Sequence, residues 1–394
     1  MQVAMFSNYL NHHQLPFCLA MEQLTGGKFT FVATEPVSAA RLKMGYRDMD
    51  RDYNFVLRSY EDAAAFEKAR DLALTCDVMI FGSAPNEFIE KRLFRRPAAV
   101  TFRYSERLFK ETAGKVNRFS LMHYYSFLCS LLQRRKNYYL LAASAYAPID
   151  YMRMGFGKKR YLKWGYFPEC AQNTLEKLQN KKAEKLRIIW AGRMIEWKHP
   201  EYAVEAAGML RDDGVDFELR FIGDGVLLED VKACVRRYGL QDKVVFTGSI
   251  PVEEVRQEME KSHILLFTSD WNEGWGAVLN EGMSSACIAV ASHAIGSVPY
   301  LIHDGENGAI YQSGDVFDLY RRLKVLAEDP VLREKMAANA YRTVTEQWNA
   351  CTAAQRLVAF SKKLLCGESG ECLYKDGPCS TAELLKETWR QSVR

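Results

Sequence analysis

The sequence predicts an α/β protein built from two doubly wound domains that face each other across a cleft. Three observations support this prediction: the length of 394 residues, an ordinary globular composition with 48% apolar and 26% charged residues, and short apolar strands that alternate with helical stretches in both halves. A chain of this length exceeds the size at which one core stops growing. Strand–helix alternation indicates parallel sheets with helices on both faces.

Five apolar runs in the first half predict strands, and helical stretches such as 60–75 and 115–135 lie between them. The predicted strands are 2–6, 28–33, 77–82, 97–103 and 138–143. Ligands of doubly wound sheets bind at the carboxyl ends of the strands, so functional residues are expected directly after these runs.

The second half repeats the pattern. Its predicted strands are 186–191, 217–222, 244–247, 263–268 and 287–291, and its predicted helices are 199–211, 226–238, 252–261, 276–285 and 315–328. The stretch 331–365 is also helical, and turn signals after Cys366 precede a short terminal helix that starts at Ser380.

The domain boundary is expected near 164–182, where a proline-containing segment and a polar run precede a new strand. We therefore expect an N-terminal domain over 1–165 and a second domain over 166–345. The remaining stretch, 346–394, is expected to form helices that pack back on the N-terminal domain.

Composition excludes several classes of protein. No apolar run reaches 18 residues, and no basic region precedes the first apolar run, so neither a membrane-spanning helix nor a signal peptide is expected. The ten cysteines are scattered without zinc-ligand spacing. This usage favours a reduced, cytoplasmic location and no metal site.

Positive charge is concentrated between Lys91 and Lys163, with 17 Lys and Arg against three acidic residues, a net charge of +14. Such a patch attracts an anionic partner. No nucleic-acid-binding signature accompanies it, whereas aromatic residues do, so we expect an anionic membrane surface or a lipid-diphosphate acceptor. A solvated surface balanced by acids from elsewhere stays open as an alternative. The residues expected to form the surface are Arg95, Arg96, Arg134, Arg135 and Lys136.

The segment after the predicted strand 263–268 carries the clearest chemistry. A glycine-containing loop leads to a helix start around Gly276, whose free backbone N–H groups favour an anion. Glu273 precedes this helix and Glu281 lies on it. Because carboxylates repel phosphates, we expect these two to accept hydrogen bonds from the neutral hydroxyls of a sugar and a ribose.

The end of the strand 186–191 supplies the positive charge that a diphosphate needs. Arg193 offers a bidentate fork, and Lys198 offers a point charge. The turn at 223–225 ends the next strand at the same sheet edge. Taken one at a time, Arg193 and Lys198 could be ordinary surface cations, and 223–225 could be an ordinary tight turn. Their coincidence at the carboxyl ends of strands in one domain predicts a diphosphate site.

In their order along the chain, these motifs resemble the family-4 retaining glycosyltransferases of glycosyltransferase group 1, which have the GT-B fold. The motifs are Gly192-Arg193 with Lys198, Gly223-Asp224-Gly225, Phe246-Thr247-Gly248, Glu273 with Glu281-Gly282-Met283, and the stretch from Asp304 to Gly308. They cover about 186–312, and a weaker architectural match covers about 1–365. The resemblance implies two Rossmann-like domains and transfer of a sugar with retention of its anomeric configuration.

By position, the resemblance assigns Arg193 and Lys198 to the donor diphosphate, Glu281 to the ribose hydroxyls and Glu273 to the donor sugar. The implied catalytic residues are Glu273, Arg193 and Lys198. The implied donor-binding residues are Gly192, Arg193, Lys198, Gly223, Gly248, Gly276, Ala277, Val278 and Glu281, with the base near 248–251. The implied donor is a UDP-, GDP- or ADP-linked sugar, with no bound cofactor and no metal.

The first domain offers acceptor-side candidates. Many members of the family carry a histidine after the strand that corresponds to 98–103, and the stretch 103–107 has none. His12 and His13 follow the first predicted strand, and Glu106 follows the fourth. An exposed helix cap is an equal alternative for the histidines, and an ion pair within the basic stretch is the favoured alternative for Glu106.

The triplet Asp48, Asp50 and Asp52 contains the Asp-x-Asp pattern that metal-dependent glycosyltransferases of another fold use. That interpretation requires a single domain and leaves the second-half motifs unused, so we expect a polar surface loop. A calcium loop is excluded, because Tyr53 and Ser59 stand where glycine and glutamate are needed.

The resemblance implies a hexosyltransferase that acts on a glycan or lipid-linked acceptor in surface polysaccharide or glycolipid assembly, peripheral on the inner face of the membrane. Two alternatives stay open: a GT-B nucleotide-sugar epimerase, and a catalytically silent subunit that binds a nucleotide sugar.

Overall fold

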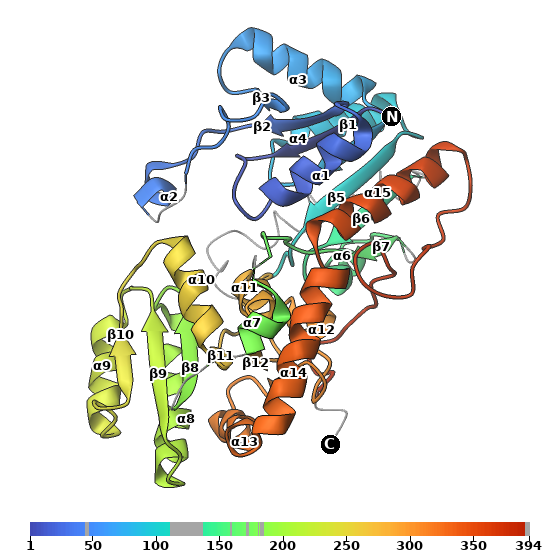
Figure 1. Ribbon diagram of the computed structural model, residues 1–394. Coiled ribbons are helices and arrows are strands. Elements are labelled where there is room, and N and C mark those ends of the chain that lie inside the picture. Colours follow the sequence, from blue (N-terminus) through green and yellow to red (C-terminus); the bar gives the residue numbers. More distant parts are fainter. Residues whose placement is uncertain are drawn as a thin grey trace. The chain divides into compact units, whose positions relative to one another are not determined.

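The computed structural model describes residues 1–43, 47–110, 137–157, 160–170, 173–179, 181 and 185–390. The chain divides into two compact units, each built on one parallel sheet (Figure 1). The first unit contains Met1–Glu169 and Trp348–Lys386, and the second contains Cys170–Gln347 and Glu387–Arg394. The boundary follows Glu169, four residues beyond the expected position, and the chain returns to the first unit at Trp348.

The sheet of the first unit has the strand order β3-β2-β1-β4-β5-β6-β7. Its strands are β1 (Val3–Ser7), β2 (Phe29–Ala33), β3 (Val56–Arg58), β4 (Val78–Phe81), β5 (Val100–Ser105), β6 (Tyr138–Ala142) and β7 (Tyr161–Lys163). The central strand β1 is buried along its whole length, as expected for a parallel strand covered on both faces. The strand order reverses between β1 and β4, which creates a crevice at their carboxyl ends.

Helices of this unit lie on both faces of the sheet, except for the short helix α2, which projects away from it (Figure 1). They are α1 (Leu15–Thr25), α2 (Ala39–Lys43), α3 (Ala63–Thr75), α4 (Asn86–Arg95), α6 (Ala147–Arg153) and α15 (Ala350–Leu365). Helices α1 and α15 pack side by side, and Phe360 of α15 lies against Phe102 and Tyr139 (Figure 1). On the other face, Phe88 of α4 packs against Phe6 and Phe66. Right-handed crossovers on either side of β1 require this division.

The sheet of the second unit has the order β10-β9-β8-β11-β12-β13. Its strands are β8 (Leu186–Ala191), β9 (Phe217–Ile222), β10 (Val244–Phe246), β11 (Ile264–Phe267), β12 (Ile288–Ser292) and β13 (Gly308–Tyr311). The larger core packs this sheet against α8 (Pro200–Asp212), α9 (Leu228–Arg237), α13 (Val316–Glu328) and α14 (Pro330–Arg342). A smaller core on the other face involves α10 (Val252–Lys261) and α11 (Val278–Ser284). Two short helices, α7 (Leu175–Gln179) and α12 (Val298–Leu301), complete the unit.

The predicted alternation of strands and helices is confirmed, but three strands escape the sequence pattern. These are β3, β7 and β13, and each lies at the edge of its sheet. Two of them are only three residues long. A strand of only three or four residues has too few positions to show a periodic pattern in the sequence. The helix expected over 115–135 lies outside the described residues.

The helical stretch 331–365 is not one helix. It divides into α14, a π-helical turn over Thr343–Gln347, and α15. The Asn349 side chain accepts a hydrogen bond from the Thr352 N–H and begins α15 anew. This break coincides with the return of the chain to the first unit at Trp348.

The expected terminal helix from Ser380 is wrong. Thr381 forms an antiparallel bridge with Leu162 of β7, and the Ser380 carbonyl accepts a hydrogen bond from the Lys163 N–H. The backbone groups of this segment therefore pair with an edge strand instead of with one another.

The expectation that 346–394 packs entirely on the N-terminal domain also needs correction. Residues Trp348–Lys386 belong to the first unit, but the chain beyond Lys386 belongs to the second. There Arg390 donates to Asp304 at 3.2 Å, and the ring of Trp389 lies 6.2 Å from that of His293. Among the described residues, no helix combines the length and apolar character needed to cross a bilayer.

Candidate functional site

Two loops at the carboxyl edge of the second sheet carry the predicted donor-site residues. Arg193 and Lys198 lie in the loop after β8, which ends in a 3₁₀ turn over Glu196–Lys198. Lys198 Nζ lies 2.7 Å from Glu273 Oε2 in the loop after β11, and the two side chains are only 13% and 12% exposed. Arg193, in the same loop as Lys198, is exposed. The structure thus brings three predicted residues to one edge and pairs two of them.

The loop that carries Glu273 is held in a tight conformation. Ser269 Oγ donates a hydrogen bond to Glu273 Oε2 at 3.0 Å. Gly276 has a φ of +82°, and a Cβ atom there would lie 2.3 Å from the Phe267 ring. A side chain at 276 would therefore force the loop apart, so Gly276 is required by backbone conformation and by packing.

His199 and Asp270 join these two loops, and sequence analysis missed both. His199 Nε2 lies 3.3 Å from Asp270 Oδ2, and His199 Nδ1 lies 3.0 Å from Glu201 Oε1. The Asp270 N–H also donates to the Trp197 carbonyl at 3.0 Å. His199 is a non-glycine residue in the left-handed region, with φ +46°, which a periodic sequence pattern does not reveal.

The charge of His199 follows from its neighbours. Burial acts to lower the pKa of His199, but hydrogen bonds to Asp270 and Glu201 outweigh burial and raise it to about 9. The imidazole is therefore protonated at neutral pH. Its ring stacks on Tyr202, with centroids 4.6 Å apart and planes at 6°.

The predicted glycines 192, 223 and 248 meet in the backbone of adjacent loops. The Gly223 N–H donates to the Gly248 carbonyl at 2.9 Å. Gly223 has a φ of +123°, and a Cβ there would lie 2.0 Å from the Gly192 carbonyl oxygen. Close loop packing explains why glycine stands at 223, whether or not a ligand approaches it.

Helix α11 starts two residues later than predicted, at Val278, with Ala277 as its N-cap residue. It is seven residues long, and Glu281 lies in its first turn. Glu281 is half-buried. Gly276 therefore lies before the helix instead of at its start, whereas Ala277 is the N-cap and Val278 the first helical residue.

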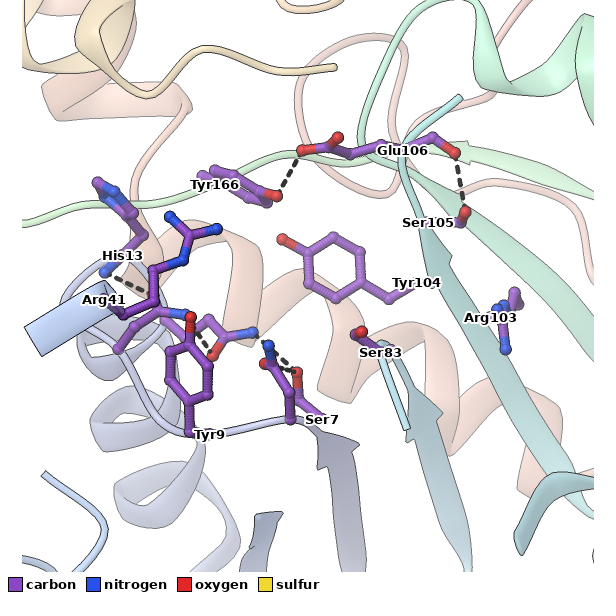
Figure 2. Close-up of a pocket in the computed structure, with 14 residues that line it drawn as sticks. Ser7, Tyr9, His13, Arg41, Ser83, Arg103, Tyr104, Ser105, Glu106 and Tyr166 are labelled. Carbon is purple, nitrogen blue, oxygen red and sulfur yellow. Dashed lines mark hydrogen bonds between the residues drawn. The ribbon is translucent and has the colours of Figure 1, made fainter. Parts of the chain in front are cut away.

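The first unit contains a separate pocket of about 460 Å³, the first-unit pocket, at the crevice between β1 and β4 (Figure 2). It is lined by Ser7, Asn8, Tyr9, Asn11, His13, Gln14, Arg41, Gly82, Ser83, Arg103, Tyr104, Ser105, Glu106 and Tyr166. Two predicted acceptor-side residues, His13 and Glu106, therefore share one pocket. Arg41, Arg103, Tyr104 and Tyr166 were not predicted as site residues, because they come from three separate segments: α2, β5 and the stretch after β7.

Glu106 is held by two partners at this pocket. Lys110 Nζ and Tyr166 Oη each lie 2.5 Å from one of its carboxylate oxygens. The ion pair with Lys110 matches the favoured alternative for this residue. Figure 2 shows the Glu106 carboxylate turned toward the Tyr166 hydroxyl.

The two histidines lie in the loop between β1 and α1, with ring centroids 3.8 Å apart. His13 lines the pocket, whereas His12 is not among its lining residues. Burial lowers the pKa of His13 to about 3, and the nearby charges of His12 and Arg41 act in the same direction. His13 is therefore neutral at physiological pH.

The aspartate triplet is not simply a polar surface loop, because Asp50 is fully buried. Its Oδ1 accepts a hydrogen bond from the Leu10 N–H at 2.9 Å, and its Oδ2 accepts one from the Tyr60 hydroxyl at 3.2 Å. Asp50 thus ties its loop to the segment after β1. Asp52 forms a surface ion pair with Arg47.

Part of the basic stretch is internal. Arg92 is fully buried and donates to the carbonyls of Ala73, Cys76 and Val100. Arg96 donates to three carbonyls at the end of α3, those of Leu74, Thr75 and Cys76. The guanidinium of Arg96 therefore caps the end of α3, so Arg96 is not only a cation of the expected membrane-facing surface. Arg95 is exposed, and Arg134, Arg135 and Lys136 lie outside the described residues.

The second unit is similar in sequence to known glycosyltransferases. Residues 172–343 match the model of a family described as glycosyl transferases, group 1. The α-D-kanosaminyltransferase of Streptomyces kanamyceticus is 28% identical over 45% of this chain and 45% of its own length. The amylovoran biosynthesis glycosyltransferase AmsK of Erwinia amylovora is 30% identical over 48% of this chain and 47% of its own. The chain thus spans less than half the length of these curated relatives.

Similar solved structures cover more of the chain. HepE of Anabaena in complex with UDP has a TM-score of 0.68 at 14% identity, over 92% of this chain and all (100%) of that chain. The lipopolysaccharide outer core galactosyltransferase WaaB has a TM-score of 0.66 at 16% identity, with the same coverage. At such identities the likeness shows the fold. The predicted α/β architecture of two doubly wound, GT-B-type units is confirmed.

Proposed function

We propose that this protein moves a sugar from a nucleotide-sugar donor to an acceptor hydroxyl, as a member of the glycosyl transferase group 1 family, whose model residues 172–343 match. The observation that carries the proposal is that Lys198 pairs with Glu273 at one sheet edge of that domain, with Arg193 exposed in the same loop as Lys198. Carboxyl edges of such sheets are where nucleotide ligands bind.

The charges at this edge suit departure of a nucleoside diphosphate. Negative charge grows on the diphosphate as the bond to the sugar breaks, and groups held in place beforehand stabilise it best. Arg193 is exposed and Lys198 is fixed by Glu273 and by stacking over Trp197, 4.8 Å from its ring centroid. We assign both cations to the diphosphate.

We assign the two carboxylates to the uncharged hydroxyl groups of the donor, from which they would accept hydrogen bonds. Glu273 faces Lys198 and is assigned to the donor sugar, and Glu281 is assigned to the ribose hydroxyls. The UDP complex of HepE supports a nucleotide of this kind as donor. We further propose that the anomeric configuration is retained, which proton NMR of the first-formed product tests directly.

A panel of donors tests the proposed reaction. The protein is incubated with UDP-, GDP- and ADP-linked sugars, with and without glycan acceptors, and free nucleotide is measured. Release of one nucleotide that is lost in Lys198→Ala supports a transferase. Tight nucleotide binding without any turnover, across all donors and acceptors, would instead identify a silent binding subunit. Formation of an isomerised sugar would identify an epimerase.

We also propose that the acceptor is a glycan or lipid-linked molecule in surface polysaccharide or glycolipid assembly, reached at the cytoplasmic face of an anionic membrane. AmsK, named for amylovoran biosynthesis, supports the pathway class. Each Lys or Arg near an acidic surface contributes about 1 kcal/mol, and salt screens it. Sedimentation with phosphatidylglycerol vesicles at low and high salt tests this, with phosphatidylcholine vesicles as control. Binding that is equal for both lipids would exclude the membrane.

A further inference from the structure

We propose that the tail segment, residues 387–390, positions the donor site by holding the loop that carries Glu273 through contacts with His293 and Trp271. The inference rests on the proposed transferase function and adds positioning residues to its donor site. Three observations support it. The tail segment belongs to the second unit, ion pairs anchor it there, and its contacts lead through His293 to the Glu273 loop.

Arg390 anchors the tail segment on the second unit. Its guanidinium lies 3.2 Å from Asp304 Oδ2 and 3.8 Å from Asp318 Oδ2, and its side chain is only 14% exposed. Asp318 is itself buried in the first turn of α13, where its Oδ2 also accepts a hydrogen bond from the Gln312 N–H at 2.8 Å. Hydrogen bonds between charged groups are stronger than neutral ones. The anchor therefore fixes the tail segment next to the loop that follows β13.

His293 receives the tail segment at the carboxyl end of β12. It directly follows that strand and is buried. Its Nδ1 accepts a hydrogen bond from the Ser313 N–H at 2.9 Å, and its ring also forms a hydrogen bond with the backbone of Glu387. Burial lowers the pKa of His293 to about 4, so the ring is neutral at physiological pH. A neutral ring whose Nδ1 accepts carries its proton on Nε2, the nitrogen that is left to donate to the tail segment.

Two tryptophan rings pack on His293, one from the tail segment and one from the donor-site loop. The ring centroid of Trp389 lies 6.2 Å from that of His293, with the planes tilted by 58°. The ring of Trp271 meets His293 edge to face, with centroids 5.1 Å apart and planes at 85°. Trp271 stands two residues before Glu273, in the loop after β11, the strand that pairs with β12. The tail segment thus reaches the Glu273 loop through one buried histidine.

Backbone hydrogen bonds tie Glu273 itself to the same two loops. The Gly296 N–H, three residues after His293, donates to the Glu273 carbonyl at 3.2 Å. The Glu273 N–H donates to the carbonyl of Asp270, the neighbour of Trp271, at 3.1 Å. A displacement of His293 would therefore move both the ring partner and a backbone partner of this loop. Misplacing a group by about 1 Å from far outside the reacting centre can cost about 100-fold in rate.

Turnover by the full chain tests the inference. Nucleotide release is measured with UDP-, GDP- and ADP-glucose, and the donor that reacts fastest is used for every variant. Calorimetric titration with the matching nucleoside diphosphate gives its affinity and the number of intact binding sites. Trp389→Ala is expected to lower kcat per intact site about tenfold or more, because the Glu273 loop loses its support. The affinity for the free diphosphate is expected to stay unchanged, because Glu273 is assigned to the sugar.

Three further variants separate positioning from stability. Trp389→Phe keeps an aromatic ring against His293 and is expected to restore most of kcat. Leu384→Ala is the matched control, exposed in the same terminal stretch but part of the first unit, and it is expected to change nothing. Arg390→Gln weakens the anchor and is expected to lower kcat in the same direction, so it decides the outcome if Trp389→Ala does not fold. A lower melting temperature with unchanged kcat per intact site would overturn the inference, because the tail segment would then only stabilise the unit.

A double variant tests the route through Trp271. If the tail segment acts through this ring, Trp389→Ala is expected to lower kcat no further in a chain that already carries Trp271→Ala. Losses of kcat that multiply would overturn this route.

Amide hydrogen exchange separates this inference from the proposed function, because it needs no turnover. Trp389→Ala is expected to speed exchange in peptides that cover 268–276 and 293–297, and to leave exchange in the first unit unchanged. Unchanged exchange in 268–276 would overturn the positioning role, whatever the kinetics. If the unaltered chain releases no nucleotide from any donor, the proposed function fails instead, and faster exchange in the variant would still support the hold of the tail segment on the Glu273 loop.

Discussion

Lys198 Nζ and Glu273 Oε2 lie 2.7 Å apart, although 75 residues separate them in the chain. The pair joins the loop after β8 to the loop after β11, and both side chains are largely shielded from solvent. An ion pair in this position holds two assigned donor-site groups at a fixed separation. It also means that neither residue can be changed without releasing the other.

Removing Lys198 is expected to weaken nucleotide binding and to destabilise the fold. Lys198→Ala leaves Glu273 largely buried without its cation, and breaking such a pair costs about 3 kcal/mol. Arg193→Ala, at an exposed position, is expected to lower UDP affinity about tenfold without a shift in melting temperature. Calorimetric titration and thermal unfolding distinguish the two variants, and unchanged UDP affinity in both would remove the diphosphate assignment.

A double-mutant cycle isolates the contribution of the pair. Because Lys198 and Glu273 contact each other, the effects of Lys198→Met and Glu273→Gln on unfolding free energy are expected not to add. We expect a coupling energy of about 1–3 kcal/mol, measured by urea unfolding at neutral pH. Additive effects would show that the 2.7 Å contact contributes little in solution.

The two glutamates are expected to separate binding from turnover. Glu273→Gln should lower kcat for the donor far more than UDP affinity, because free UDP lacks the sugar that Glu273 is assigned to contact. Glu281→Gln should weaken UDP itself, because every nucleotide carries the ribose. Loss of one stabilising group in the transition state commonly costs about 3 kcal/mol, a hundredfold or more in rate. Equal losses of UDP affinity in both variants would contradict this division.

His199 makes the stability of the second unit depend on pH. Its pKa is raised from 6.5 to about 9 in the folded chain, so the stabilising contribution is fully present below pH 6.5 and is lost as the pH rises through 9. His199→Asn keeps a residue that tolerates the left-handed region but removes the charge. Its melting temperature is expected to lie below that of the parent at pH 6 and to converge with it by about pH 10. A gap that stays constant over this range would show that the charge of His199 does not stabilise the loops.

Arg92 is expected to be essential for the first unit although it belongs to the basic stretch. Arg92→Met leaves several buried carbonyls without their donor, and we expect a loss of about 3 kcal/mol or more in unfolding free energy. Arg95→Met, three residues along the same helix and exposed, is the control and should change stability by less than about 0.5 kcal/mol. Similar losses of unfolding free energy in both variants would show that the hydrogen bonds of Arg92 do not account for the stability of the first unit.

Sequence alone determined the repeated alternation of strands and helices, and it placed Arg193, Lys198 and Glu273 after the strands that the structure shows as β8 and β11. Hydrophobic periodicity and turn residues are local properties, so they can be recognised in the sequence without the tertiary structure. The edge strands β3, β7 and β13 were too short to give a recognisable pattern. Thr381 is extended because it pairs with Leu162 of β7, a contact that the local sequence does not reveal.

Only the tertiary structure decided which charges meet. The pairing of Lys198 with Glu273, the left-handed His199 between two carboxylates, and the convergence of Arg41, Arg103 and His13 on one pocket join segments far apart in the chain. It also turned Arg92 and Arg96 from an apparent surface patch into internal hydrogen-bond donors. Such contacts depend on how the loops after separate strands pack at one sheet edge. A local sequence pattern does not determine the distance between side chains on different loops.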